Sequence, residues 1–239
     1  MCRFVNVHYS LLPHYRGRAN VNWAIINGET TAGISIHLVV PELDGGNLLF
    51  QRAIPIAAND TVTTLYERLN AIQEDELGNV VVRAINGYQG ISQNAENASY
   101  GCTRVPEDGE IDWRQPTETI DRLIRGLTPP FPGAFTYLAG QRLIIARASP
   151  LDAPRYIGRV PGRIAGRSRS DGWVDVLTGD GVLRVFTVLP LDTDRPCAAA
   201  SVIRSTRATL GLSRLDLLRR IVALEDRLAS LERLEGVHE

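Results

Sequence analysis

The chain has 239 residues, 44% of them apolar, and a formal net charge of -1, so it can bury one large core or two small ones. This near-neutral balance excludes a global electrostatic attraction to nucleic acid or to anionic membranes. No apolar run reaches the roughly 18 residues of a membrane span, and the start lacks the order of a signal peptide, so a cytoplasmic protein is expected. All 26 basic residues are arginines, which excludes lysine chemistry of the Schiff-base and P-loop kinds.

The first hundred residues alternate predicted strands and helices. Residues 3–8 are predicted as a strand, and because strand side chains alternate, Asn6 and His8 share one face. A Pro- and Gly-containing loop follows, and Gly28 is expected to end the next helix. Helical spacing returns after Asp60 or Thr61, either of which can act as the N-cap. The other elements expected here are a helix at 20–27, strands at 33–40 and 47–56 around a turn at 41–46, and a helix between 60 and 87.

The second half of the chain is predicted to be rich in strands. A polar, turn-rich segment at 100–113 has the composition of a linker, and residues 117–127 have the pattern of a helix that prolines terminate. Short runs with strand patterning then follow, separated by Gly- and Asp-containing turns. Together they favour a small barrel or sandwich. The expected strands lie at 142–148, 155–166, 172–178 and 181–189.

The last segment is predicted as a helix from Arg214 to Leu234, with Ser213 and Asp216 as a capping pair. Its apolar residues step by four and three, which is typical of a short coiled coil with another copy of the chain. A flank of further apolar residues widens this stripe, so packing on the preceding barrel is the alternative. The stripe consists of Leu217, Ile221, Leu224, Leu228 and Leu231, and the flank of Leu215, Leu218 and Val222.

Polar residues at one strand end and in one turn form a candidate reaction site. Asn6 and His8 end an apolar strand, and in α/β sheets ligands bind outside the carboxyl ends of strands. An amide donor beside an imidazole suits a developing oxyanion, and Asp44 adds a carboxylate in a Gly-rich turn that a planar ligand can approach. The residues alone leave open a structural role for the histidine and a turn role for the aspartate. His14 and His37 have no second ligand at metal spacing and are assigned structural roles, so no metal is expected.

Several motifs resemble one enzyme family. "NVHYSLLPHYRGR", "NWAIINGE", "TAGISIH" and "LDGGNLLFQ" resemble, in order and spacing, the formyltransferases that use 10-formyltetrahydrofolate, and "PEDGEIDW" and "FPGAFTYL" resemble their linker and second domain. The resemblance implies an α/β fold: the C-terminal half of a Rossmann-like domain (1–105), a linker helix with a small barrel similar to an oligonucleotide-binding fold (106–205), and a terminal amphipathic helix (212–236). Relatives carry further residues ahead of the first motif. The resemblance therefore implies a chain that begins within a domain, as a fragment, a misassigned start or half of a split protein, and that is a poor enzyme alone.

The resemblance also implies the reaction and the residues that perform it. Formyl transfer would run from 10-formyltetrahydrofolate to a primary amine, with Asn6 donating to the formyl oxygen. His8 would stabilise that oxygen or relay the proton, and Asp44 would act as base or hold the imidazole in the required protonation state. No metal or covalent intermediate is needed. Residues expected to bind the donor are Leu43, Asp44 and Gly45, and those expected to bind the acceptor are Ser10, Arg16 and Gly17.

Two acceptors fit the resemblance. The segment "RGRANVNWAIINGETTAG" is closer to the members that formylate nucleotide-linked amino sugars. A run of arginines without an acid could instead hold the phosphates of initiator methionyl-tRNA, although it could equally hold the diphosphate of a sugar nucleotide or form only a solvated strand face. A hypothesis of another class is a truncated, non-catalytic binding or assembly module. The arginines of that run are Arg155, Arg159, Arg163, Arg167 and Arg169.

Overall fold

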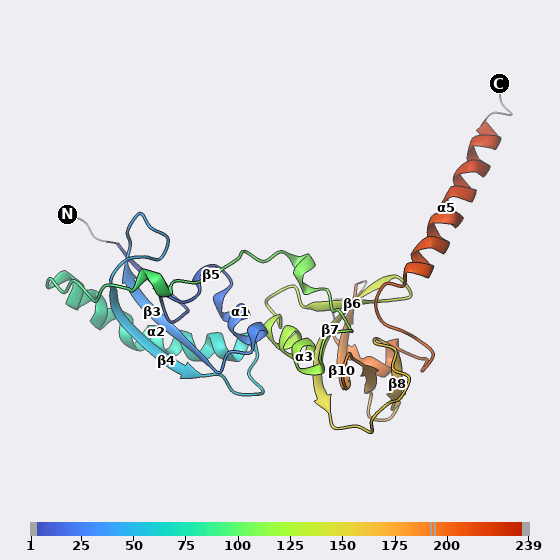
Figure 1. The fold of residues 1–239 in the computed structure, drawn as a ribbon, viewed down its shortest axis with the longest axis horizontal. Coiled ribbons are helices and arrows are strands. Elements are labelled where there is room, and N and C mark those ends of the chain that lie inside the picture. The colour runs from blue at the N-terminus through green and yellow to red at the C-terminus, as the bar shows by residue number, and fades with distance from the viewer. Residues whose placement is uncertain (1–3, 192, 194, 236–239) are drawn as a thin grey trace.

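The structure is a computed structural model that describes residues 4–191, 193 and 195–235. It is elongated (Figure 1), with an α/β region at one end, a β-rich region beside it, and a single helix projecting beyond the latter. The mixed α/β part and the small β part confirm the fold class expected from the sequence. The division into segments ending at 105 and 205 stays a prediction, although the buried apolar residues do separate into clusters in the two regions.

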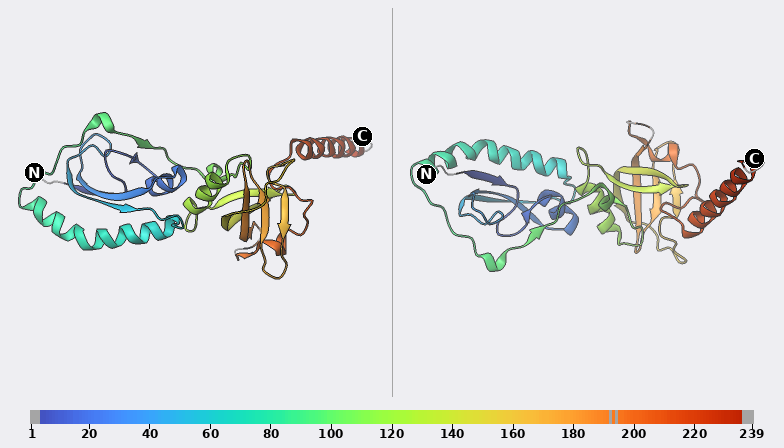
Figure 2. Two further views of the ribbon diagram at one scale, coloured as in Figure 1. Left: turned by 60° about the horizontal axis from the view of Figure 1, so that its bottom comes forward. Right: turned by 90° about the horizontal axis from the view of Figure 1, so that it is seen from above.

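The α/β region is built on a three-stranded antiparallel sheet in the order β1-β3-β4. The strands are β1 (Val5–His8), β3 (Thr31–Leu38) and β4 (Leu48–Pro55). In their register Asn6 is the partner of His37, and His8 is the partner of Ser35. Helix α2 (Val62–Ile85) runs along the sheet, and helix α1 (Asn20–Asn27) packs at one end (Figure 2).

Local chemistry accounts for the bounds of these two helices. Thr61 is the N-cap of α2 and forms a reciprocal capping box with Thr64, which satisfies backbone groups that the first turn leaves unpaired. Gly28 ends α1 with a φ of 77°, a left-handed conformation that glycine adopts without strain. Both ends agree with the predictions from sequence.

The core of this region lies between α2 and the sheet. Helix α2 buries Val62, Leu65 and Leu69 at helical spacing, and these meet Ile34 of β3. A second, smaller cluster joins Ile36, Leu49 and Val80 further along the same interface. Removing this apolar surface from water holds the sheet against the helix, with each buried side chain contributing roughly 1.5–3 kcal/mol.

A connecting segment returns along the sheet edge and leads into the second region. Strand β2 (Arg16–Gly17) pairs in parallel with β5 (Tyr100–Gly101), which ties the loop after β1 to this segment. Helix α3 (Thr117–Gly126) packs against both α1 and strand β7. Two short 3₁₀ helices lie in the connection: η1 (Ala95–Asn97) and η2 (Pro106–Gly109).

The β-rich region is one antiparallel sheet in the order β6-β7-β10-β9-β8, with β11 paired to β10. The strand pairings recorded for the described residues do not close it into a barrel. Instead, residues 208–211 bridge its two edges: Leu210 donates to the Gly162 carbonyl beside β8, and Gly211 donates to the Tyr137 carbonyl on β6, each at 2.8 Å. The elements are β6 (Ala134–Leu138), β7 (Gln141–Leu151), β8 (Ile164–Arg167), β9 (Val174–Leu177), β10 (Val182–Pro190), β11 (Cys197–Ala198) and α4 (Ala199–Val202).

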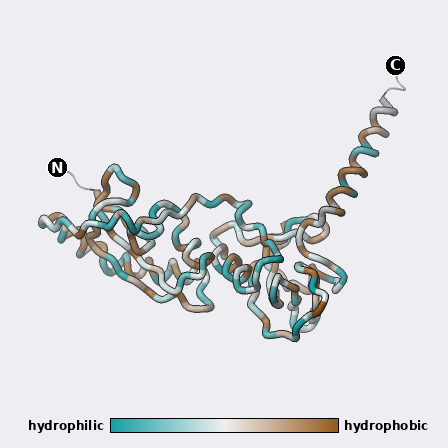
Figure 3. The backbone as a smooth tube through the Cα atoms, viewed as in Figure 1, coloured by the Kyte–Doolittle hydropathy of each residue, from teal (hydrophilic) through white to brown (hydrophobic). Residues whose placement is uncertain are grey.

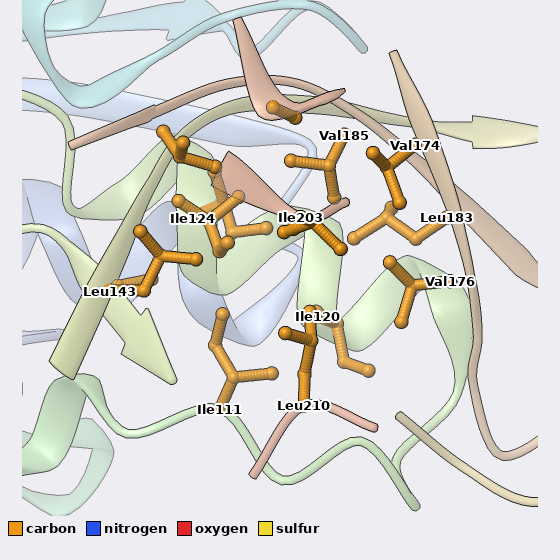
Figure 4. Packing of buried hydrophobic residues seen from close by; sticks show 14 of the residues in the cluster. Ile111, Ile120, Ile124, Leu143, Val174, Val176, Leu183, Val185, Ile203 and Leu210 are labelled. Atoms are coloured by element: carbon orange, nitrogen blue, oxygen red, sulfur yellow. The ribbon is translucent and has the colours of Figure 1, made fainter. Parts of the chain in front are cut away.

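A single apolar cluster fills this curved sheet (Figure 4). Ile120 and Ile124 of α3 belong to this cluster, so α3 packs against the sheet through its buried face. Ile111 and Trp113 are 4% exposed, and the Trp113 indole donates to Thr136 Oγ1. The second half of the predicted linker is therefore part of this core.

One strand expectation is wrong over most of its length. The sequence predicts a strand over 155–166, but the strand β8 is confined to Ile164–Arg167, preceded by an isolated bridge from Arg163 to Thr209, and residues 152–162 form turns and irregular structure. Gly158 and Gly162 have φ values of 76° and 83°, and Pro161 lacks an N–H for pairing. Arg155 and Arg159 consequently lie outside any strand, so the predicted arginines do not form one stripe along a barrel.

Helix α5 (Arg214–Glu235) projects away from the β-rich region (Figures 1 and 2). The predicted helix is confirmed, and it does not pack along the preceding sheet. Among the described helices, none is long and apolar enough to span a membrane.

Candidate active site

Asp44 lies between two histidines. Its Oδ2 is 3.6 Å from His8 Nδ1, and its Oδ1 is 3.6 Å from His37 Nε2. All three side chains are nearly buried, with Asp44 the most accessible at 11% exposed. The carboxylate comes from the loop between β3 and β4, whereas the histidines come from β1 and β3. Two strands and a loop thus bring one acid and two imidazoles together.

His37 orients the Asn6 amide. The His37 Nδ1 lies 2.9 Å from the Leu38 carbonyl, which can only accept, so Nδ1 carries the hydrogen and Nε2 is left as an acceptor. Asn6 Nδ2 donates to this Nε2 at 3.2 Å. Burial lowers the pKa of His37, which favours this neutral form. The second N–H of Asn6 Nδ2 is therefore available to another acceptor.

His8 presents its other nitrogen to Asp44. The Nε2 lies 2.8 Å from the Tyr15 carbonyl and so carries the hydrogen, which makes Nδ1 the proton acceptor beside Asp44. The Asn20 amide also lies against Nε2, at 2.9 Å from Nδ2, while its Oδ1 has no partner. Exchanging the two ends of that amide would let Oδ1 accept from Nε2–H. Proton uptake at Nδ1 would then create an imidazolium that faces a carboxylate.

A buried arginine holds the loop that carries Asp44. Arg16 is 1% exposed, and its guanidinium donates to Glu42 Oε1 at 2.7 Å and to Gln93 Oε1 at 2.9 Å. Gln93 in turn donates to the carbonyls of Asp44 and Gly46, each at 2.7 Å. These bonds hold the loop in place. Asp44 itself has a φ of 50°, a left-handed conformation that aspartate tolerates better than most residues.

The loop after β1 is held from β3. Ser35 Oγ donates to the Ser10 carbonyl at 2.6 Å and accepts from the Leu12 N–H at 3.1 Å. At the far end of this loop, the Gly17 N–H donates to Asp44 Oδ2 at 2.8 Å. The "SLLPHYRG" motif therefore wraps around the histidine and returns to the carboxylate.

An exposed apolar patch lies on the Asp44 loop. Val39, Val40 and Leu43 are 51%, 41% and 58% exposed. Side chains of this kind seldom gather beside a polar site without a partner. The patch offers a surface on which a flat, partly apolar ring can lie next to the carboxylate.

A cavity of about 310 Å³ lies beside the segment that follows Gly17. Arg18, Ala19 and Asn22 line it from this segment, and none of the three reacting candidates is among its lining residues. Its remaining walls come from α2 and from the connection into the β-rich region. They are Tyr66, Thr103, Arg104, Val105, Pro106, Gly109, Leu127, Phe131, Pro132 and Gly133.

The polar lining of this cavity is basic and partly unsatisfied. Its charged side chains are Arg18 and Arg104, with no acid among the lining residues. Burial lowers the pKa of Arg104, an effect that Asp108 opposes, and the guanidinium stacks over Trp23 at 4.8 Å. Asn22 is 1% exposed, donates to the Gly126 carbonyl, and has an Oδ1 without a partner. An anionic ligand with hydrogen-bond donors would match this lining.

The expected catalytic residues lie together, and the expected binding residues lie in the segments around them. Asn6, His8 and Asp44 meet, as a shared site requires. Ser10 and Arg16, expected to bind the acceptor, are buried and bonded inside the loop: the Ser10 hydroxyl donates to the His14 carbonyl. The backbone of Gly17 contacts Asp44, Leu43 lies in the apolar patch, and Gly45 N–H donates to the Glu42 carbonyl.

Two further members of the cluster were not found from the sequence. The sequence predicts a structural role for His37, and it predicts Asn20 only as the first residue of a helix. The register of β1 against β3, which sets Asn6 opposite His37, is the signal that identifies the former. Among the described residues, no group of three or more His, Cys, Asp and Glu side chains could hold a metal ion.

Comparison with protein families matches both regions. Residues 1–82 match the model described as "Formyl transferase", and residues 104–207 match that of "Formyl transferase, C-terminal domain". Together the two matches span most of the chain. The first lies in the α/β region, and the second covers the β-rich region.

Solved structures of similar fold carry related descriptions. HypX from Aquifex aeolicus in complex with tetrahydrofolic acid has a TM-score of 0.64 at 19% identity, over 85% of this chain and 35% of that one. The N-formyltransferase from Helicobacter canadensis, in complex with folinic acid and dTDP-3-aminofucose, has 0.58 at 22% identity, over 76% and 64%. Methionyl-tRNA formyltransferase from Clostridium thermocellum has 0.55 at 24% identity, over 63% and 64%. The chain thus spans about a third of the length of the HypX chain.

Proposed function

Because this chain belongs to the formyltransferase family, we propose that it transfers a formyl group from 10-formyltetrahydrofolate to the primary amine of a nucleotide-linked amino sugar. The observation that carries the proposal is the cluster of Asn6 and His8 on strand β1 with Asp44 on the loop between β3 and β4. It combines a free amide donor, a proton-accepting imidazole nitrogen and a carboxylate, the groups that amine acylation requires.

The donor fits the residues at the Asp44 loop. The exposed apolar patch of Val39, Val40 and Leu43 would support a planar heterocycle, and the adjacent Asp44 would accept from its ring N–H groups. When bound, the donor supplies the formyl carbon and a leaving nitrogen. The complexes of HypX with tetrahydrofolic acid and of the Helicobacter canadensis enzyme with folinic acid support a folate here.

The side chains of the cluster can complete the transfer without a further reactant. As the amine nitrogen bonds to the formyl carbon, an electron pair moves to the formyl oxygen, and the free N–H of Asn6 stabilises it. His8 Nδ1 takes the proton that the amine loses, and Asp44 at 3.6 Å stabilises the resulting imidazolium. When the bond to the leaving nitrogen breaks, His8 returns the proton to that nitrogen, which restores the site.

The cavity with Arg18 and Arg104 supports a sugar nucleotide as acceptor. Two guanidinium groups in a lining that contains no acidic residue would bind a diphosphate, and a volume of about 310 Å³ matches a small ligand. The dTDP-3-aminofucose in the complex of the Helicobacter canadensis enzyme is a ligand of this class.

The alternative acceptor is initiator methionyl-tRNA. The fold is shared with a methionyl-tRNA formyltransferase, but the predicted arginine stripe is interrupted. Two of its members also have partners within the protein: Arg163 donates to Thr209 and Arg167 donates to the Ala200 carbonyl. This reduces the basic surface on which the tRNA hypothesis depends.

A formylation assay tests the proposal. The chain is incubated with 10-formyltetrahydrofolate and either a panel of nucleotide-linked amino sugars or charged initiator tRNA, and tetrahydrofolate release is followed spectroscopically. We expect turnover with an amino sugar nucleotide, and Asp44→Asn should reduce it by about a hundredfold or more. If only the charged tRNA is formylated, methionyl-tRNA rather than an amino sugar is the acceptor. If the chain binds folate but transfers no formyl group, the hypothesis of a non-catalytic module is favoured.

A further inference from the structure

Helix α5 presents an apolar face that no other part of the described chain covers. It projects from the β-rich region (Figures 1 and 2), and apolar segments recur along its length (Figure 3). Leu217, Leu224 and Leu231 are 42%, 62% and 57% exposed. Near its start, Arg220 donates to the Ala139 carbonyl of the turn between β6 and β7. In proteins, most of the stability of an amphipathic helix comes from packing its apolar face.

The apolar residues follow a seven-residue repeat. With Leu217, Leu224 and Leu231 at position d, position a is occupied by Ile221 and Leu228. Spacing of this kind keeps one seam of the helix facing a partner helix. Ile at position a together with Leu at position d favours assemblies of two parallel strands.

Charges beside the seam select the partner and its direction. Arg220 and Arg227 occupy position g, and Glu225 occupies position e. Between parallel, in-register copies, position g of one helix faces position e of the next heptad of the other, so Arg220 meets Glu225 of the second copy. Antiparallel copies would place arginine near arginine. The helix has five arginines and five acidic residues, so it carries no net charge to favour an anionic membrane surface.

We propose that α5 pairs with α5 of a second copy of this chain as a parallel, in-register, two-stranded coiled coil. The guanidinium of Arg220 has N–H groups beyond the one that bonds to Ala139, so it can meet the partner without releasing the β6–β7 turn. The pairing brings the two β-rich regions to the same end of the coil. The catalytic cluster lies at the far end of the chain from α5 and stays outside the interface (Figure 1).

The mass of the full chain in solution tests the pairing. Light scattering across a concentration series should give about twice the chain mass of 26.3 kDa. Leu224→Lys, which places a charge in the seam, should raise the dissociation constant at least tenfold and shift the mass toward one chain. The matched control is Ala223→Lys, which places the same charge on the next residue, at exposed position c, and should remain dimeric. A monomeric wild type, or a dimer equally resistant to both substitutions, would overturn the proposal.

Disulfide capture tests the direction of pairing. In a parallel, in-register coil the two copies of a d residue face each other near the disulfide distance, so Leu217→Cys should give a covalent dimer under mild oxidation. The background from exposed Cys102 is measured in the wild type, and Ala223→Cys serves as the off-seam control. A dimer that Leu224→Lys dissociates but Leu217→Cys fails to capture would exclude the parallel arrangement.

Discussion

Asn6 and His37 are direct cross-strand partners in the sheet, and the Asn6 amide donates to His37 Nε2 at 3.2 Å. Because the His37 Nδ1–H is held by the Leu38 carbonyl, this contact allows one orientation of the Asn6 amide. We expect His37→Leu to lower the kcat of formyl transfer about tenfold or more with little change in KM, since a misdirected donor weakens transition-state binding.

A double-mutant cycle separates this positioning role from a general loss of structure. If His37 acts through Asn6, the double variant Asn6→Ala with His37→Leu should be no slower than Asn6→Ala alone. His37→Gln, which keeps an acceptor, should recover part of the kcat. Steady-state kinetics and thermal unfolding of the wild type and these four variants provide the check. Fully additive losses would show that the two residues act independently.

Burial of His37 also makes the stability of the fold depend on pH. Its pKa is lowered from 6.5 in the folded protein, so the unfolded chain binds the proton more readily. The contribution of neutral His37 is therefore complete above about pH 6.5 and declines as the pH falls toward the folded-state pKa. Between about pH 7.5 and pH 5.5, the melting temperature of the wild type should fall more than that of His37→Gln. If the melting temperatures of the wild type and His37→Gln fall by the same amount over this range, His37 is not the cause of the pH dependence of stability.

His8 and Asp44 should both be needed for turnover. His8→Ala removes the proton acceptor, and Asp44→Asn removes the charge that stabilises the imidazolium, so each should reduce kcat by about a hundredfold or more. Asparagine also tolerates the left-handed backbone at position 44, so the fold should be retained. Glu67→Gln, on the exposed side of α2, is the control and should leave kcat unchanged. Near-normal turnover of either site variant would remove that residue from the mechanism.

Arg104 should govern the acceptor rather than the donor. Replacing its guanidinium with the amide of Arg104→Gln removes a charge-assisted contact to a diphosphate, and we expect the KM for the amino sugar nucleotide to rise about tenfold. The KM for 10-formyltetrahydrofolate should stay within error, because the apolar patch on the Asp44 loop is a different surface. An equal rise in both constants would place the acceptor elsewhere or indicate a folding defect.

The sequence by itself determined the elements whose causes are local. The end of α1 at Gly28, the start of α2 after Asp60 or Thr61 and the existence of helix α5 follow from caps or from periodicity within about a turn or two of each position. The motifs also predict Asn6, His8 and Asp44 as the catalytic residues, because their residue types and order are distinctive along the chain, and their catalytic roles stay a prediction.

Contacts between distant residues were decided only by the tertiary structure. His37 joins the cluster because β1 and β3 pair with Asn6 opposite it, and Arg16 is buried because Glu42 and Gln93 meet it from other segments. The run at 155–161 has strand-like composition, but the positive φ of Gly158 and the missing N–H of Pro161 interrupt it, and it forms no strand. Pairing register and burial depend on segments up to a hundred residues apart. A pattern read along a short window carries no information about such contacts.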